Sequence, residues 1–280
     1  MAHERGESDW GDWLPRAIAR ADPETVAVWY LGCNGLVLKG SEGTTVFVDP
    51  YCGTGDPPRL VRMIPVPFDP EDVTAAAAVV ATHEHSDHVH GPTQGPLLAG
   101  TGATYYAPDA SLDVVAEEGW RDAYDLGDDR FREVSEGDSF GIGEFDVRVV
   151  AVNDPDADHP VGYLFEHDAG TVFHGGDTRP GDALAAVGAR HEVDLGVVAF
   201  GTVGRLLDPA TGGPARKRWY CDENQAIEAA NDLQLDRLLP THWDVWKGMT
   251  ADPTALHGHA RSFDYPRRLE VVEVGDRVDL

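Results

Sequence analysis

The chain has 280 residues, of which 42% are hydrophobic, so it can bury one large core or two small ones. Its formal net charge of −27 repels polyanions, which argues against nucleic acid as a partner at ordinary salt. It contains no apolar run long enough to cross a bilayer, and residues 1–21 lack the regions of a signal peptide. We therefore expect a cytoplasmic protein without membrane contact.

The first half of the chain alternates strand patterns with turn signals. The predicted strands are residues 26–31, 36–39, 44–49, 75–82, 104–107 and 145–152, with a further strand at Phe140. The predicted helices are residues 94–99 and 112–118. A loop rich in glycine and proline, residues 51–70, precedes the buried strand at 75–82.

The second half repeats this layout. Its predicted elements are a hairpin of strands 161–166 and 171–174, a buried strand at 195–200, a helix at 222–233 capped by Asp222, and a last strand at 237–240. Strand-rich halves that each carry helices predict an α/β (α+β) fold, with two sheets face to face and helices outside. We treat residues 1–280 as a single domain.

The hexapeptide His-Glu-His-Ser-Asp-His, which begins at His83, directly follows the apolar run 75–81. Imidazole and carboxylate ligands suit zinc, manganese or iron. In an extended backbone His83 and His85 point the same way and can share one ion. Asp87 and His88 are predicted to open a helix and to turn toward a second ion. The alternative is a degenerate site in a non-catalytic protein.

A two-metal hydrolytic site also needs a carboxylate that touches both ions, which lie roughly 3.5–4 Å apart. Asp177 is the candidate, because it follows a strand and because Gly175 and Gly176 let the backbone approach closely. His242, at the end of another buried strand, is the second remote candidate. Polar residues of ligand type follow three of the predicted strands, and core packing alone does not explain this arrangement.

The hexapeptide, the Gly-Gly-Asp-Thr element at 175–178 and the Pro-Thr-His element at 240–242 resemble the metallo-β-lactamase superfamily. The resemblance implies a four-layer αββα sandwich with two divalent metal ions, zinc or manganese, at one edge of the two sheets. The implied ligands are His83 and His85 for the first ion, Asp87, His88 and His242 for the second, and Asp177 as the bridge.

Further motifs resemble the L-ascorbate-6-phosphate lactonase branch of that superfamily, from about Trp13 to about Pro253. They are residues 29–35, 52–55, 81–83, 161–165, 174–177 and 251–253. This resemblance implies hydrolysis of a small anionic lactone and hints at a homo-oligomer.

Many superfamily members supply a third histidine to the first ion, from a loop that here reads Asn-Asp-Pro-Asp-Ala-Asp-His at 153–159. The lactonase branch carries an aspartate in the matching place, so Asp154 is the first choice and His159 the alternative. A carboxylate there would favour manganese over zinc.

Three further positions are candidates for supporting or substrate-binding roles. Asp49 ends a strand and is either a turn residue or a group that orients His83 or His85. His174 could donate a hydrogen bond to a ligand, and Lys247 could bind an anion.

A basic triplet stands out in so acidic a chain. It lies in residues 204–220, a segment that differs from the branch pattern, and comprises Arg216, Lys217 and Arg218. It could hold a substrate phosphate or form a solvated loop.

The acidic residues are spread along the chain, and there are only three lysines. Salt screens the self-repulsion of such a surface, so we hypothesise a halophilic source. The three cysteines, Cys33, Cys52 and Cys221, are far apart and are predicted to be buried free thiols.

Together these features predict metal-assisted hydrolysis of a small anionic lactone or ester, in which a hydroxide bridging two ions attacks the carbonyl. Asp87 would both ligate and steer the proton of the nucleophile. The alternatives are a phosphodiesterase with the same two ions and a regulatory module that keeps the metal for structure.

Overall fold

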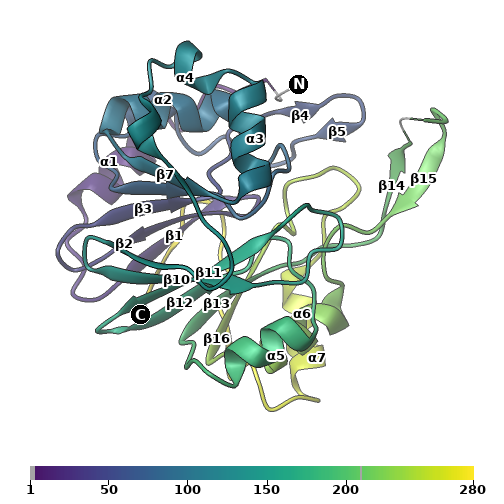
Figure 1. The fold of residues 1–280 in the computed structure, drawn as a ribbon. Helices are drawn as coiled ribbons and strands as arrows, with labels where there is room; N and C mark the ends of the chain where they lie inside the picture. The colour runs from purple at the N-terminus through teal and green to yellow at the C-terminus, as the bar shows by residue number, and fades with distance from the viewer. Residues whose placement is uncertain (1–3, 209) are drawn as a thin grey trace.

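The computed structural model describes residues 4–208 and 210–280. Two mixed seven-stranded sheets face each other. Helices α1 to α4 cover the outer face of the first sheet, and α5 to α7 cover the outer face of the second (Figure 1). The predicted sandwich of two sheets between two helical layers is confirmed.

The first sheet has the strand order β18-β1-β2-β3-β6-β7-β8. Its strands are β1 (Ala27–Gly32), β2 (Gly35–Lys39), β3 (Thr45–Val48), β6 (Ala78–Val80), β7 (Thr104–Ala107), β8 (Phe131–Glu133) and β18 (Arg277–Asp279). The strands β1, β2 and β3 pair antiparallel, whereas β3, β6, β7 and β8 pair parallel. It follows that β1, β3 and β6 all end at the same edge of the sheet.

The second sheet has the strand order β17-β16-β13-β12-β11-β10-β9. Its strands are β9 (Ser139–Ile142), β10 (Phe145–Ala151), β11 (Val161–His167), β12 (Gly170–His174), β13 (Leu195–Ala199), β16 (Arg237–Thr241) and β17 (Arg268–Leu269). The strands β12, β13, β16 and β17 are parallel, so their carboxyl ends also share one edge.

The helices are short and lie mostly in the connections between parallel strands. They are α1 (Trp13–Arg20), α2 (Gly91–Thr101), α3 (Asp109–Glu117), α4 (Trp120–Ala123), α5 (Asp182–Gly188), α6 (Glu223–Asp232) and α7 (Leu256–Ala260), with 3-10 turns η1 (Pro70–Asp72), η2 (Asp128–Arg130) and η3 (Pro253–Ala255). Asp222 caps α6 as predicted, because its side chain accepts a hydrogen bond from the Gln225 backbone N–H. In the described part of the chain, no helix combines the length and apolar character needed to cross a bilayer.

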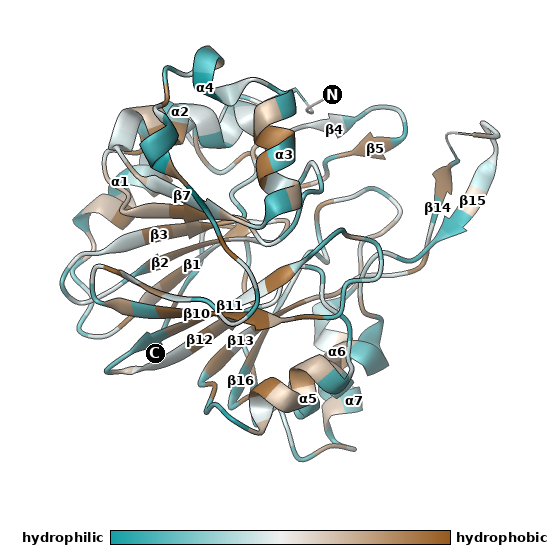
Figure 2. Ribbon diagram, viewed as in Figure 1, coloured by the Kyte–Doolittle hydropathy of each residue, from teal (hydrophilic) through white to brown (hydrophobic). Residues whose placement is uncertain are grey.

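The main core lies between the two sheets, where the strands are predominantly apolar (Figure 2). On β1, Val28 and Tyr30 pack into this core together with Val147 of the second sheet. The alternate residues Trp29 and Leu31 pack on the other face, against the helical layer. Strands covered on both faces read as continuous apolar runs, which is why the sequence predicts them well.

Two small hairpins lie outside the sandwich. The predicted loop 51–70 contains β4 (Gly55–Asp56) and β5 (Leu60–Val61). The second hairpin, β14 (Gly204–Leu207) and β15 (Pro214–Lys217), projects from the body of the molecule (Figure 1).

The predicted helix opening at Asp87 and His88 is wrong. These residues lie in a turn in which the His88 and Val89 backbone N–H groups donate to the His85 carbonyl. Helix α2 begins three residues later, with a proline in its first turn, where the fixed φ of that residue favours a helix start.

Candidate metal centre

The candidate site lies where the parallel strands of both sheets end. Asp49 follows β3 and His83 follows β6, while Asp177 follows β12 and His242 follows β16. Asp154 lies in the connection between β10 and β11. Each sheet therefore contributes donors to one edge of the sandwich, as the resemblance implies.

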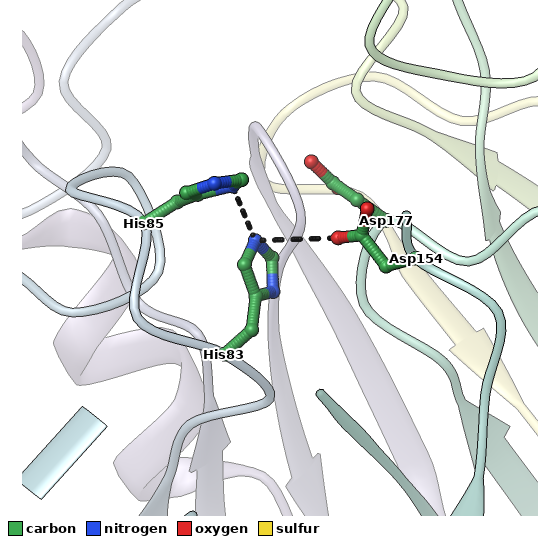
Figure 3. A group of neighbouring side chains, drawn as sticks. All are labelled: His83, His85, Asp154 and Asp177. Atoms are coloured by element: carbon green, nitrogen blue, oxygen red, sulfur yellow. Dashed lines mark hydrogen bonds and ion pairs between the residues drawn. The ribbon is translucent and has the colours of Figure 1, made fainter. Parts of the chain in front are cut away.

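Four side chains converge on one point in the first cluster: His83, His85, Asp154 and Asp177 (Figure 3). The Nε2 atom of His83 is 2.9 Å from Nδ1 of His85 and 3.8 Å from Oδ2 of Asp154. The donor atoms of all four residues lie within 4.8 Å of one another. Two imidazoles and two carboxylates at this separation can share one cation.

A second cluster consists of His88, Asp177 and His242. The Oδ1 atom of Asp177 is 3.5 Å from Nε2 of His88 and 3.5 Å from Nε2 of His242. Asp177 thus belongs to both clusters, which is the position that a bridging carboxylate requires.

Cys33 lies beside this second cluster, and sequence reasoning missed it. Its Sγ atom is 3.6 Å from Nε2 of His242 and 3.7 Å from Oδ2 of Asp87. Burial and the carboxylates of Asp87 and Asp177 raise the pKa of the Cys33 thiol well above its ordinary value. The only signal in the sequence is the position of Cys33 at a strand end.

The loop at 153–159 directs Asp154, and not His159, into the site. The side chain of Asp154 is 1% exposed and belongs to the first cluster. The side chain of His159 is 76% exposed, and its Nδ1 lies 2.9 Å from a carboxylate oxygen of Asp109 on α3. The structure therefore places Asp154, the first choice, in the cluster and leaves His159, the alternative, at the surface.

Two buried donor atoms of the clusters have no hydrogen-bond partner, namely Nε2 of His88 and Oδ2 of Asp154. Buried polar atoms are normally paired, because an unpaired one loses its hydration without compensation. Both atoms point into donor clusters, so the residues present fit divalent cations.

Asp49 contacts the ring of His88 directly and reaches His83, one of the two expected histidines, through the Thr82 hydroxyl, which lies 3.0 Å from His83 Nδ1. Its Oδ2 accepts a hydrogen bond from Thr82 Oγ1 at 2.7 Å and lies 2.8 Å from Nδ1 of His88. Burial would raise the pKa of Asp49, but the His88 imidazole brings it below its ordinary value. A carboxylate on Nδ1 leaves Nε2 of the imidazole free to bind an ion.

His174 and Asn34 support the turn that carries Asp177. Nε2 of His174 donates to the Asn34 carbonyl at 2.8 Å, and Nδ1 accepts from the Gly176 N–H at 3.2 Å. Asn34 donates through Nδ2 to Asp177 at 3.2 Å and accepts from Thr241 at 2.6 Å. Asn34, which sequence reasoning missed, thereby links the ends of three strands.

The two carboxylates of the first cluster have pKa values shifted in opposite directions. Burial and the neighbouring Asp177 carboxylate raise the pKa of Asp154 from 3.8 to about 6. Burial alone would raise the pKa of Asp177, but the His242 and His88 imidazoles hold it below its ordinary value. Such opposed shifts between neighbouring acids are typical of functional sites.

A cavity of about 320 Å³ opens onto the clusters, a size that suits a small molecule. Arg59 and Leu60 from the β4–β5 hairpin form one wall, and Trp219, Tyr220 and Trp246 form another. Among the described residues, Arg59 is the only lysine or arginine in the lining.

The basic side chains singled out in the sequence do not line this cavity. Arg216 and Lys217 lie on β15, and Arg218 pairs with Asp222 at 2.8 Å. Lys247 is exposed, next to Trp246, which does line the cavity. The cation that faces the site is Arg59, which carries no distinctive sequence signal.

Known proteins resemble this chain in sequence and in fold. The probable L-ascorbate-6-phosphate lactonase UlaG of Escherichia coli (strain SMS-3-5 / SECEC) is 27% identical over 295 residues, covering 89% of this chain and 78% of the relative. Igni18, a metallo hydrolase from Ignicoccus hospitalis, has a TM-score of 0.67 at 17% identity, covering 91% of this chain and 98% of Igni18.

A third relative has a different reaction. CmlA, a diiron β-hydroxylase from Streptomyces venezuelae, has a TM-score of 0.65 at 17% identity, covering 92% of this chain and 55% of CmlA. The fold alone therefore does not determine the reaction. A family model described as a β-lactamase superfamily domain matches residues 44–243. With this match and its two packed seven-stranded sheets, the chain belongs to the metallo-β-lactamase superfamily.

Proposed function

We propose that this protein is a metal-dependent hydrolase that opens a lactone or ester bond in a small anionic substrate. The observation that carries the proposal is the pair of donor clusters that share Asp177 at the base of a cavity. The similarity to a probable L-ascorbate-6-phosphate lactonase supports a lactone as the substrate class.

Seven side chains would hold two divalent ions. They are His83, His85 and Asp154 for the first ion, Asp87, His88 and His242 for the second, and Asp177 between them. Ions bound there would supply a hydroxide at neutral pH and a Lewis acid for the substrate carbonyl. The donor set at the first position, two imidazoles and carboxylates, is compatible with zinc or manganese.

Asp87 is the side chain placed to orient the nucleophile. It lines the cavity, and its Oδ2 lies 3.3 Å from Nε2 of His242. Burial alone would raise the pKa of Asp87, but the hydrogen bond with His242 and the charge of His88 hold it well below its ordinary value. Asp87 is therefore ionised at neutral pH and can accept a hydrogen bond from the attacking water.

Arg59 and the aromatic wall are suited to an anionic substrate. The Arg59 Nε atom is buried without a hydrogen-bond partner, and its nearest carboxylate, that of Asp56, is 3.8 Å from NH1. A guanidinium with unused donors at the edge of a cavity binds phosphate or carboxylate groups. Trp219 and Trp246 line the same cavity and would limit the access of water to the reacting groups.

Metal analysis combined with a substrate panel tests the proposal. The reconstituted protein should bind two equivalents of zinc or manganese and should hydrolyse phosphorylated lactones faster than phosphodiesters. Asp177→Ala and His85→Ala should lose metal and hydrolysis together, because each removes a donor from a cluster. The control His159→Ala, on the exposed end of the loop that carries Asp154, should keep both.

Two results would contradict the proposal. One is full hydrolysis by a variant that contains no metal. The other is a wild-type protein that binds metal and cleaves phosphodiesters but no lactone or ester, since this outcome would favour the phosphodiesterase alternative.

A further inference from the structure

Cys33 differs from the other two cysteines in what its sulfur contacts. All three are buried free thiols, as predicted. Cys52 Sγ donates to the Phe68 carbonyl at 3.4 Å, and Cys221 Sγ donates to the Thr178 carbonyl at 3.4 Å. The Cys33 sulfur instead lies beside two ionisable side chains, those of Asp87 and His242.

The sulfur of Cys33, Nε2 of His242 and Oδ2 of Asp87 form a compact triangle. Its edges are 3.6 Å from sulfur to nitrogen, 3.7 Å from sulfur to oxygen and 3.3 Å from nitrogen to oxygen. The three donor atoms thus face one another at distances short enough for one shared ion.

The size of this triangle matches three ligands of one zinc ion. At the usual zinc bond lengths, tetrahedral ligands lie about 3.5 Å apart when one is sulfur and about 3.3 Å apart when both are nitrogen or oxygen. Ligands at right angles with the same bond lengths would lie about 2.8–3.1 Å apart. The observed edges match three ligands separated by about the tetrahedral angle, so one zinc ion can contact all three.

The backbone holds Cys33 and His242 together. The Cys33 carbonyl accepts a hydrogen bond from the His242 N–H at 2.7 Å and another from the Tyr30 hydroxyl at 3.1 Å. Both residues have left-handed backbones, with φ of 57° for Cys33 and 65° for His242. Non-glycine residues in this region are uncommon and often lie at functional sites, where surrounding contacts maintain the strain.

The ring of His242 is also fixed in orientation. Tyr220 stacks on it with ring centroids 4.0 Å apart and an interplanar angle of 25°. A ring held by stacking and by its own backbone keeps Nε2 directed at the Cys33 sulfur. The triangle is therefore preorganised for an ion and does not need to form upon binding.

We propose that Cys33 is a thiolate ligand of the second ion beside Asp87, His88 and His242, which makes that position selective for zinc over manganese. The inference rests on the proposed function, because it assumes that the centre binds two ions. Binding releases the thiol proton to solvent, since a coordinating thiol is deprotonated. A soft sulfur ligand selects zinc, whereas the carboxylates of the first cluster also accept manganese.

Cobalt substitution tests this directly, because a Co²⁺–thiolate bond produces a charge-transfer band in the near ultraviolet. We expect this band when Co²⁺ is added to the metal-free protein. Cys33→Ser should bind cobalt without the band, and Cys52→Ser, which changes a buried thiol outside the clusters, should keep it.

Zinc affinity provides a second readout. Cys33→Ser should weaken one of the two zinc equivalents by more than the ~10–100-fold that loss of an outer hydrogen-bond partner causes. The same variant should change manganese affinity at the first position little.

The outcomes separate this inference from the proposed function. Cobalt that binds to the wild-type protein with no charge-transfer band overturns the role of Cys33 and leaves the hydrolase proposal intact. Failure of the wild-type protein to bind cobalt, zinc or manganese overturns both. The wild-type spectrum alone decides the first point, so the test does not depend on whether Cys33→Ser folds.

Discussion

Asp154 is a residue at which the demands of stability and of ion binding conflict. It stands where many relatives are expected to have a histidine. Its Oδ2 is buried without a hydrogen-bond partner, and the Asp177 carboxylate is a neighbouring like charge. A cation would compensate both carboxylates. Without one, ionised Asp154 is a buried charge beside a like charge, which destabilises the fold.

Replacing Asp154 by asparagine should therefore stabilise the metal-free protein at neutral pH. The folded pKa of about 6 lies above the ordinary 3.8, so ionisation of Asp154 costs stability as the pH rises through this window. We expect Asp154→Asn to raise the free energy of unfolding by on the order of 1–3 kcal/mol at neutral pH and by much less below the ordinary pKa. Urea denaturation with a chelator present at both pH values measures this.

The control for that experiment is Asp158→Asn, an exposed carboxylate in the same loop. It should change the free energy of unfolding little at either pH. If Asp154→Asn destabilised the metal-free protein at neutral pH, the side chain would have a stabilising role that the unpaired oxygen does not suggest.

At the scale of elements, the two small hairpins have different relations to the site. The β4–β5 hairpin carries Arg59 into the lining of the cavity. The β14–β15 hairpin carries Arg216 and Lys217 on a projection from the body (Figure 1). The structure thus places Arg59 at the cavity, whereas the basic triplet in the sequence pointed to residues 216–218.

Arg59→Gln should raise KM for anionic substrates without affecting neutral ones. Loss of a hydrogen bond to a charged group should raise this KM roughly tenfold to hundredfold. Steady-state kinetics with paired phosphorylated and neutral esters measure it, and Arg216→Gln provides the matched control, with no change expected for either substrate. An equal loss for both substrates would instead assign Arg59 to the structure of the hairpin.

At the scale of the whole molecule, the acidic surface predicts that salt stabilises the fold. Between about 0.1 M and about 1 M salt the Debye length falls from ~10 Å to ~3 Å, which screens repulsion within a chain of net charge −27. The melting temperature should therefore rise over a potassium chloride titration. A matched series with an uncharged osmolyte separates screening from water activity, and unfolding in molar salt would refute the halophilic hypothesis.

Much of the architecture follows from local patterns. Apolar runs bounded by glycine turns predict the buried strands, and Asp222 as a capping residue predicts the start of α6. The helix expected at Asp87 is wrong, because hydrogen bonds to the His85 carbonyl form a turn there. The strands β4 and β5 have two residues each, which is too short to produce a periodic signal.

The candidate donors likewise divide into those that local sequence identifies and those that only the tertiary structure brings together. The hexapeptide at His83 and the aspartate after two glycines identify metal chemistry by residue type and spacing alone, since both depend on neighbours in the chain. Cys33 and His242 meet across 209 residues, and Asp49 reaches His88 across 39. Spacing cannot encode such contacts. They arise because the parallel strands of both sheets end at one edge, and this packing selects which donors meet there.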